Sequence, residues 1–366
     1  VLNGVVLLEQ SLKLTSFRPS LPISRVVSLT GLVGAIVAML LINPLFSLVA
    51  FVVTFLLYEY LSLRHLEAPW SDVRSGMFIN VAEWAAKRVL SLPQGQDRAW
   101  KPSLLVPVRG TAALRYSYRF LNAITRPNGT IHILGYYENG RRDEIKGILA
   151  FENAFANDGV FARVALVEVR SLRYTLQTAM EVFTSAFFRP NILFMPILPD
   201  TDPEKLQFIL DRAAENEMAA VLYLDNPNTA LGREKVINVW IREQSPQWEV
   251  GLRLTNLDLT LLLAFQLARN WHGQINLITV VHDEAEKNNG EHFMSQLIEY
   301  GRMPKNTNAI VAVDTFASYL PHAPQADLNI FGLQERVDID FARQMIVATD
   351  SSCVFVRDSG NESALA

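Results

Sequence analysis

The sequence predicts an α/β protein in which a transmembrane helical hairpin precedes a cytoplasmic, mostly parallel sheet with helices on both faces. Three observations support this prediction. No charged residue occurs between Arg25 and Glu59. From Ser103 onward, short apolar runs alternate with helical patterns, which is typical of parallel sheets. Two stretches of this second part repeat the same order of elements, which indicates two related α/β halves.

The uncharged run is interpreted as two membrane spans. One helix of this length would exceed the roughly 30 Å hydrocarbon core of a bilayer, and Asn43-Pro44 interrupts the run. Proline removes a backbone donor and disfavours helix at the residue before it. We therefore expect spans at about 25–42 and 44–61, joined by a tight turn. The alternative is a buried helical hairpin of a soluble protein, which rarely runs this long without a charge.

Basic residues flank the predicted hairpin and indicate its orientation. Lys13, Arg18 and Arg25 precede it, Arg64 follows it, and the turn is uncharged. The positive-inside bias therefore places both ends in the cytoplasm, in an integral protein of the cell membrane. The chain starts with Val1 rather than Met and shows no secretory signal, so we expect an N-terminal part to be missing.

Four segments are expected: a membrane segment at 1–62, an amphipathic connecting helix and linker at 63–99, a first α/β half at 100–232 and a second α/β half at 233–366. The connecting helix is predicted because apolar residues recur at steps of three and four. These residues are Phe78, Val81, Ala85, Val89 and Leu92. Such a helix packs on a partner or on a neighbouring domain.

The predicted strands are short apolar runs, and many of them are continuous, as in strands buried on both faces. They are Ser103–Val108, Thr130–Tyr137, Phe161–Val169, Ile192–Ile197, Ala219–Leu224, Val236–Ile241, Trp248–Leu254, Ile275–Val281, Ala309–Val313, Asp327–Phe331 and Cys353–Val356. The helix expected at 257–271 is apolar on nearly every side and should be buried all round.

The internal repeat consists of Asn191–Asp225 and Asp327–Asp358. Each stretch reads as a strand, a loop, an acidic helix and an apolar strand, and the two have similar lengths. We infer two related halves, and convergent α/β patterning is the alternative.

Composition argues against several classes of function. A net charge of -4 and a pI near 5.9 argue against a nucleic-acid partner. The one cysteine, Cys353, excludes an intramolecular disulfide framework and a cysteine-rich zinc site, and its apolar strand indicates an inert thiol. The sequence holds no P-loop, GxSxG elbow or HExxH motif. We therefore predict that the protein is not an enzyme.

Ligands of open α/β sheets bind at the carboxyl ends of strands, and two such ends carry polar residues. Arg109-Gly110-Thr111 contains one glycine, which favours an ordinary strand-to-helix turn over a phosphate-binding loop. Asp200 and Asp202 could hold magnesium, but Asp202-Pro203 is a common way to cap a helix. Capping is the favoured interpretation.

Histidines and carboxylates also gather around a later predicted helix, at His282-Asp283-Glu284 and Glu291-His292. These residue types can bind a metal, but the i, i+4 spacing of a metal-binding helix is absent. The acidic residues favour a solvated helix N-terminus. We therefore expect neither a metal nor a cofactor.

Several short motifs follow one another along the chain in a recognisable order. They are Arg18-Pro19-Ser20, Asn43, Trp100-Lys101-Pro102, Arg189-Pro190-Asn191 and Leu259-Thr260-Leu261-Leu262. Together with the order of segments, they resemble the C-terminal part of the cation-chloride cotransporter family, within the amino acid-polyamine-cation superfamily. The stretch 255–258 departs from the acidic and glycine-rich residues of animal members, which suggests a prokaryotic or distant member.

The resemblance implies a secondary transporter that carries chloride with sodium or potassium by electroneutral symport. Its ion-binding core would lie upstream of Val1, so no ion-binding residue is expected in this chain. The two halves would resemble universal stress proteins and form a regulatory domain in a homodimer, with the lipid bilayer and transported ions as further partners. The alternatives are an amino acid permease of the same superfamily and a membrane-anchored, stress-protein-like ligand sensor.

Overall fold

A computed structural model of the protein describes residues 25–63, 73–90, 100–138, 140, 142–186, 188–244, 248 and 257–365. The chain divides into two compact units, Val1–Gln94 and Gly95–Ala366. Each unit is considered by itself.

The first unit contains helices α2 (Arg25–Ile42), α3 (Pro44–Leu63) and α4 (Val73–Leu90). Asn43 separates α2 from α3 as predicted, and its side-chain oxygen accepts a hydrogen bond from the Phe46 backbone N–H at 3.0 Å. The Ser47 hydroxyl reaches back to the Met39 carbonyl at 2.7 Å, which fastens the turn. Apolar side chains of both helices are largely exposed within the chain, as at Ile42 with 85% exposure.

The predicted transmembrane hairpin is wrong. Among the residues that the structure describes, every helix is too short or too polar to cross a membrane. The physical reason is the division of the uncharged run at Asn43. The 18 residues of α2 rise only about 27 Å, and the uncharged part of α3 is shorter still, against a hydrocarbon core of roughly 30 Å.

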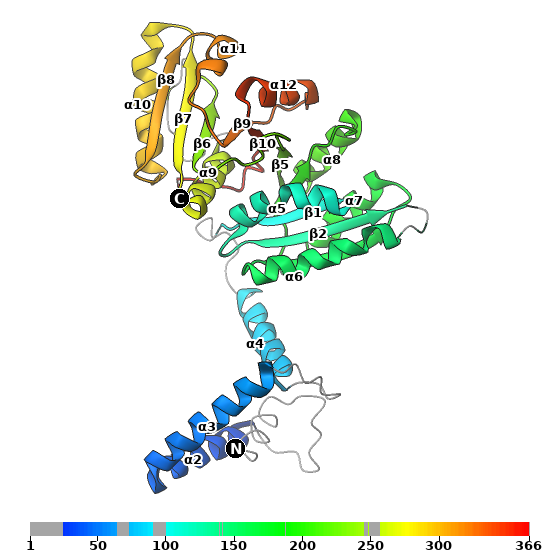
Figure 1. Ribbon diagram of the computed structural model, residues 1–366, viewed down its shortest axis with the longest axis vertical. Helices are drawn as coiled ribbons and strands as arrows, with labels where there is room; N and C mark the ends of the chain where they lie inside the picture. The colour runs from blue at the N-terminus through cyan, green and yellow to red at the C-terminus, as the bar shows by residue number, and fades with distance from the viewer. Residues whose placement is uncertain are drawn as a thin grey trace. The chain divides into compact units, whose positions relative to one another are not determined.

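The second unit is built on one sheet, to which the described part of the chain contributes ten strands (Figure 1). The strands are β1 (Ser103–Val108), β2 (Thr130–Tyr137), β3 (Phe161–Glu168), β4 (Ile192–Pro196), β5 (Ala219–Leu224), β6 (Val236–Ile241), β7 (Gln274–Val281), β8 (Thr307–Val313), β9 (Leu328–Gly332) and β10 (Ser352–Arg357). Of the strand predicted at 248–254, Trp248 is not in a strand, and the remainder lies outside the described residues.

The sheet order is β3-β2-β1-β4-β5-β10-β9-β6-β7-β8. Neighbouring strands are parallel except at the centre, where β5 and β10 are antiparallel and Leu222 pairs with Phe355. Each group of five therefore has the same internal order, with its third, second, first, fourth and fifth strands side by side. The two groups meet through their fifth strands.

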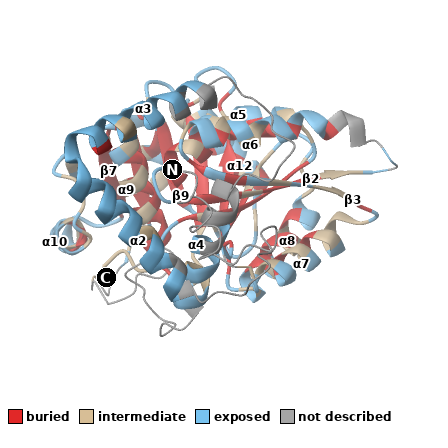
Figure 2. Cartoon of the chain, turned by 90° about the horizontal axis from the view of Figure 1, so that it is seen from below, coloured by how far each residue is buried: buried red, intermediate tan, exposed pale blue. Residues whose placement is uncertain are grey.

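Helices cover both faces of the sheet. They are α5 (Thr111–Thr125), α6 (Ala150–Asn157), α7 (Leu172–Phe183), α8 (Pro203–Glu215), α9 (Asp258–Trp271), α10 (Glu284–Tyr300), α11 (Phe316–Tyr319) and α12 (Ile339–Thr349), with 3-10 segments η2 (Arg142–Leu149) and η3 (Leu320–His322). One apolar cluster lies under α5, α6, α9 and α10, and another lies under α7, α8, α11 and α12. Figure 2 shows buried residues along the strands and exposed ones on the outer sides of the helices.

The halves also touch through helices that occupy equivalent places in the two groups of strands. Helix α5 follows the first strand of its group and α9 follows the first strand of the other. On α9, the Asn270 amide donates to the Arg126 carbonyl at 3.0 Å, just beyond the end of α5, and Gln266 donates to the same carbonyl. The two halves are thus joined by a strand pair and by helix contacts.

Candidate functional site

Two loops in equivalent positions of the halves approach each other over β5 and β10. The loop at 197–202 follows β4 and the loop at 333–338 follows β9. From α12, Arg343 donates to the Pro199 carbonyl at 2.9 Å. From α8, the Gln207 amide donates to the Glu335 carbonyl at 3.1 Å, and its oxygen accepts from the Val337 N–H at 2.8 Å. Each half therefore holds the loop of the other.

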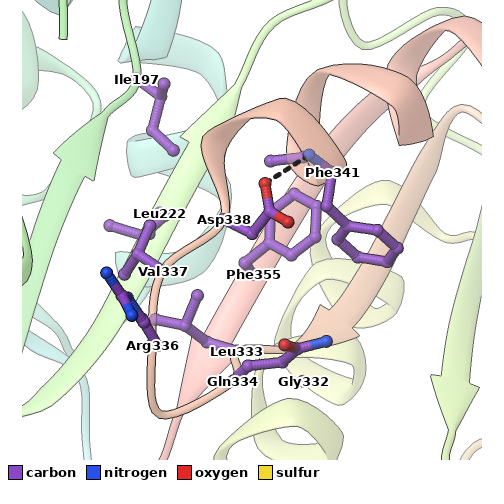
Figure 3. A pocket seen from close by; sticks show the side chains of 11 residues that line it. Ile197, Leu222, Gly332, Leu333, Gln334, Arg336, Val337, Asp338, Phe341 and Phe355 are labelled. Carbon is purple, nitrogen blue, oxygen red and sulfur yellow. Dashed lines mark hydrogen bonds between the residues drawn. The ribbon is translucent and has the colours of Figure 1, made fainter. Parts of the chain in front are cut away.

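Two hollows lie between these loops. The smaller has a volume of ≈ 20 Å³ and an apolar lining that includes Leu222, Phe341 and Phe355 (Figure 3). The larger has a volume of ≈ 630 Å³ and is lined by residues of both loops and of the first turns of α8 and α12. This larger hollow is the candidate binding site, because both halves contribute to it.

The charged groups around the larger hollow are of both signs. Its lining includes two arginines and three aspartates, namely Arg336, Arg343, Asp200, Asp338 and Asp340. Arg343 lies 3.5 Å from the Asp340 carboxylate, and Asp338 accepts from the Phe341 N–H at 2.8 Å as the cap of α12. Most of these groups are thus engaged in local contacts, which suits a contact surface better than a catalytic centre.

The capping interpretation of Asp202 is confirmed. Its carboxylate accepts from the backbone N–H groups of Glu204 at 3.0 Å and Lys205 at 3.2 Å, with Pro203 in the first turn of α8. The backbone N–H of Lys205 is the largest cause of the lowered pKa of Asp202, and its ammonium group adds to this effect. An anionic cap at the positive end of a helix accounts for this carboxylate without a metal.

The residues after β1, from Arg109 to Thr111, connect the strand to helix α5. Gly110 is the N-cap residue of α5, in extended conformation, and no side chain caps that helix. Burial raises the pKa of nearby Tyr136, an effect that the charge of Arg109 opposes and that of Asp200 increases. The phenol of Tyr136 is therefore influenced by a positive charge, on Arg109, and by a negative charge, on Asp200.

The histidines and carboxylates around α10 are separated by the structure. His282 lies 2.8 Å from Glu243, Asp283 caps α10 by accepting from the Ala285 N–H at 3.1 Å, and His292 contacts Gln296. Within the described residues, no three ligating side chains are arranged to hold a metal ion. Burial raises the pKa of the Cys353 thiol to about 12, so its reactive thiolate form is scarce at neutral pH.

Where the structure describes them, the residues that carry the family resemblance form a helix cap, contacts between strands or part of the buried core. Arg18, Pro19 and Ser20 lie outside the described residues, and Asn43 caps α3. Pro190 is buried before β4, and Asn191 ties that strand to the start of β1. Leu259, Thr260 and Leu261 are buried in the first turn of α9, with Leu262 partly buried beside them.

One polar cluster was not found from the sequence. Asp358 follows β10, and its carboxylate accepts from the Asp258 N–H at 3.0 Å, at the start of α9. The Asp258 carboxylate accepts from the Ala364 N–H at 2.6 Å, and Glu362 accepts from Ser359. An acidic residue directly after the last apolar strand was the one available signal, and it does not reveal burial.

The comparisons with known proteins agree on the second unit. Residues 106–231 match the first part of the C-terminal domain of prokaryotic cation-chloride cotransporters, and residues 232–365 match the second part. No curated protein is significantly similar in sequence to the chain.

One solved structure gives the same result, and two others are more distantly similar. The cytoplasmic domain of a prokaryotic cation chloride cotransporter is 31% identical, with a TM-score of 0.65, and the alignment covers 73% of this chain and 99% of that one. A protein of unknown function from Pseudomonas aeruginosa is 13% identical over 72% of this chain and 95% of that one, with a TM-score of 0.47. A universal stress protein from Archaeoglobus fulgidus is 9% identical over 71% and 97%, with a TM-score of 0.44. The chain therefore belongs to the prokaryotic cation-chloride cotransporter family, and residues 106–365 form the cytoplasmic C-terminal domain of such a protein.

Proposed function

We propose that this domain is the regulatory and dimer-forming part of a secondary transporter in the cell membrane that carries chloride together with sodium or potassium. The observation that carries the proposal is the match of both halves to the cotransporter domain. We infer in addition that the complete protein belongs to the amino acid-polyamine-cation superfamily. Its mechanism would then be alternating access around an ion site in its membrane part.

The chemistry of the domain supports a role away from catalysis and away from the ion path. Asp202, in the loop after β4, caps α8, and Arg343 of α12 makes a contact between the halves. The Cys353 thiol is buried with 0% exposure. The proposal therefore assigns the domain neither an enzymatic activity nor a cofactor, and its acidic surface gives no reason to expect a nucleic-acid partner.

The proposed homodimer is supported by exposed apolar side chains on α4. Ile79, Val81 and Trp84 are exposed on this helix, whereas Lys87 pairs with Glu83 at 2.5 Å. A helix with such a face gains stability by packing on a partner. Analytical ultracentrifugation of the chain should give twice the mass of one chain, and Trp84→Ser should weaken the association. A monomer at every concentration would remove the dimer from the proposal.

The transport function is tested by tracer uptake of the full-length gene product in proteoliposomes. Rubidium uptake is measured with and without chloride, and amino acid uptake is measured in parallel. We expect rubidium uptake that requires chloride. Amino acid uptake that is independent of chloride would replace the cotransporter by a permease, and no flux of either kind would favour a ligand sensor.

The regulatory part of the proposal needs a variant in the domain. Asn270→Ala removes a hydrogen bond between the halves, and Asn288→Ala, on the exposed side of α10, is the matched control. We expect Asn270→Ala to change the chloride-dependent flux at equal protein amount, whereas the control leaves it unchanged. Equal flux in both variants and the native protein would argue against regulation through this contact.

A further inference from the structure

Four asparagines lie side by side across the sheet of the second half. We call them the asparagine row: Asn308 on β8, Asn276 on β7, Asn238 on β6 and Asn329 on β9. Each is the register partner of the next, on strands that are neighbours in Figure 1. Asn238 is 1% exposed, and Asn276 and Asn329 are 2% exposed. A buried amide costs free energy unless its donors and acceptor are paired, so the hydrogen bonds of this row decide its effect.

The side chains of the row form a chain of hydrogen bonds that ends outside the strands. Asn308 donates to Asn276 at 3.1 Å, and Asn276 donates to Asn238 at 2.9 Å. Asn238 in turn donates to the backbone carbonyl of Pro324 at 2.7 Å. Pro324 belongs to the crossover between β8 and β9, residues 314–327. The row therefore holds a segment that is not itself part of the sheet.

A second contact between the row and the crossover is made through Trp240, two residues after Asn238 on β6. Its indole N–H donates to the Asn329 side chain at 2.8 Å. Its ring meets the rings of Phe316 and Tyr319 in α11 edge-on, with centroid distances of 5.3 and 6.4 Å. The row thus orients the indole on which the helical part of the crossover packs.

Different side chains occupy the equivalent register positions of the first half, namely Arg163, His132, Leu105 and Leu193. There the crossover between β3 and β4 contains α7, a helix of 12 residues, and Leu176 and Met180 of α7 belong to the same apolar cluster as the two leucines of the sheet. A helix satisfies most of its backbone groups internally, so it can cover an apolar surface.

The crossover of the second half cannot cover the sheet in this way. Helix α11 has only four residues, and residues 323–327 are not helical. A carbonyl in such a segment needs a donor from elsewhere, and the Asn238 amide supplies one to Pro324. The polar row and the short helix are therefore two sides of one arrangement.

We propose that the asparagine row is the anchor of the crossover 314–327, and that it replaces the covering helix that the first half has in α7. Asn238 satisfies the Pro324 carbonyl, Asn329 orients the indole under α11, and the rest of the row keeps both side chains in position. Because the crossover leads directly into β9, which pairs with β10, the anchor also fixes the part of the second half that meets the first.

The test is amide hydrogen exchange of the whole chain, compared between the native protein and Asn238→Ala. The reporters are the hydrogen-bonded amides of the crossover, which are those of Ser318, Tyr319 and Asp327. Their exchange should become at least about tenfold faster, because the Pro324 carbonyl loses its donor and the crossover opens locally. Exchange as slow as in the native chain would overturn the proposal.

A neighbouring variant separates the anchor from a general loss of stability. Asn276→Ala makes the same substitution one strand away, removes the same bond between Asn276 and Asn238, and also removes the bonds from Asn308 and Gln274. It leaves the bond from Asn238 to Pro324 in place. The crossover should therefore exchange more slowly in Asn276→Ala than in Asn238→Ala. Equal or faster exchange in Asn276→Ala would refute the anchor.

A third variant tests the contact at the indole, and a fourth is the control. Trp240→Phe keeps an aromatic ring but has no N–H for Asn329, so the amides of Ser318 and Tyr319 should exchange faster. Unchanged exchange there would overturn the proposal even if Asn238→Ala does not fold. Asn288→Ala, on the exposed side of α10, should behave like the native chain.

Discussion

The side-chain oxygen of Asn191 accepts a hydrogen bond from the Ser103 backbone N–H at 2.9 Å, across 88 residues of sequence. The Asn191 amide donates to the Lys101 carbonyl at 2.9 Å. One side chain therefore satisfies a donor and an acceptor where β1 begins beside β4. Asn191, which belongs to a motif that supports the family resemblance, thus links the starts of two neighbouring strands by hydrogen bonds.

Asn191→Ala should lower the free energy of unfolding by about 1–3 kcal/mol, because it leaves the Ser103 N–H and the Lys101 carbonyl without their partner. Chemical denaturation followed by circular dichroism measures the loss. Asn288→Ala on exposed α10 is the control and should change stability by less than about 0.5 kcal/mol. Equal stability of the two variants would show that the Asn191 hydrogen bonds do not stabilise the protein.

Asp338→Ala should remove the cap of α12 and destabilise the protein by about 1 kcal/mol. The carboxylate accepts from the Phe341 N–H at 2.8 Å, and this donor has no substitute within the helix. Asp338→Asn retains the acceptor and should be close to neutral. The comparison of the two midpoints of denaturation separates capping from charge, and a full loss in Asp338→Asn would show that charge dominates.

Cys353 should resist thiol reagents in the folded protein. Its side chain is buried, and burial raises the pKa of the thiol to about 12. A disulfide reagent at pH 8 should modify it only after denaturant is added. Rapid modification of the native chain would mean that β10 is accessible to solvent.

Asp358→Asn should stabilise the protein at pH 8 and have little effect at pH 4. The folded pKa of Asp358 lies above its unfolded value, so its contribution is present at low pH and is lost as the pH rises towards about 7. After allowance for partial exposure, we expect a gain of about 1–3 kcal/mol at pH 8. Thermal unfolding at both pH values measures it, and a gain of the same size at pH 4 would point to a cause other than ionisation.

Local strand signals were predicted well from the sequence. The runs Ser103–Val108, Thr130–Tyr137 and Ala219–Leu224 coincide with β1, β2 and β5 residue for residue. Continuous apolar runs bounded by turn residues are short-range signals, so one sequence suffices. The antiparallel pairing of β5 with β10 is a long-range feature, and no local pattern encodes it.

The errors have physical causes as well. Hydropathy predicts two membrane spans in the uncharged run around Asn43, but hydropathy reports composition, whereas crossing a bilayer also requires sufficient helix length. The acidic cluster of Asp258, Asp358 and Glu362 was missed because its burial arises from a contact between distant segments. The helix caps at Asp202 and Asp283 can be predicted from the sequence, because a cap depends only on residues next to it in the chain.

The central strand pair has a consequence for how the domain unfolds. If one half were to melt, β5 or β10 of the other half would present unpaired N–H and C=O groups, and such open edges recruit other chains. Because β5 and β10 belong to one chain, each strand has its partner at a high effective concentration, higher than separate subunits would provide. We therefore expect the halves to melt in a single cooperative transition, and aggregation to begin at this edge when that cooperativity is lost.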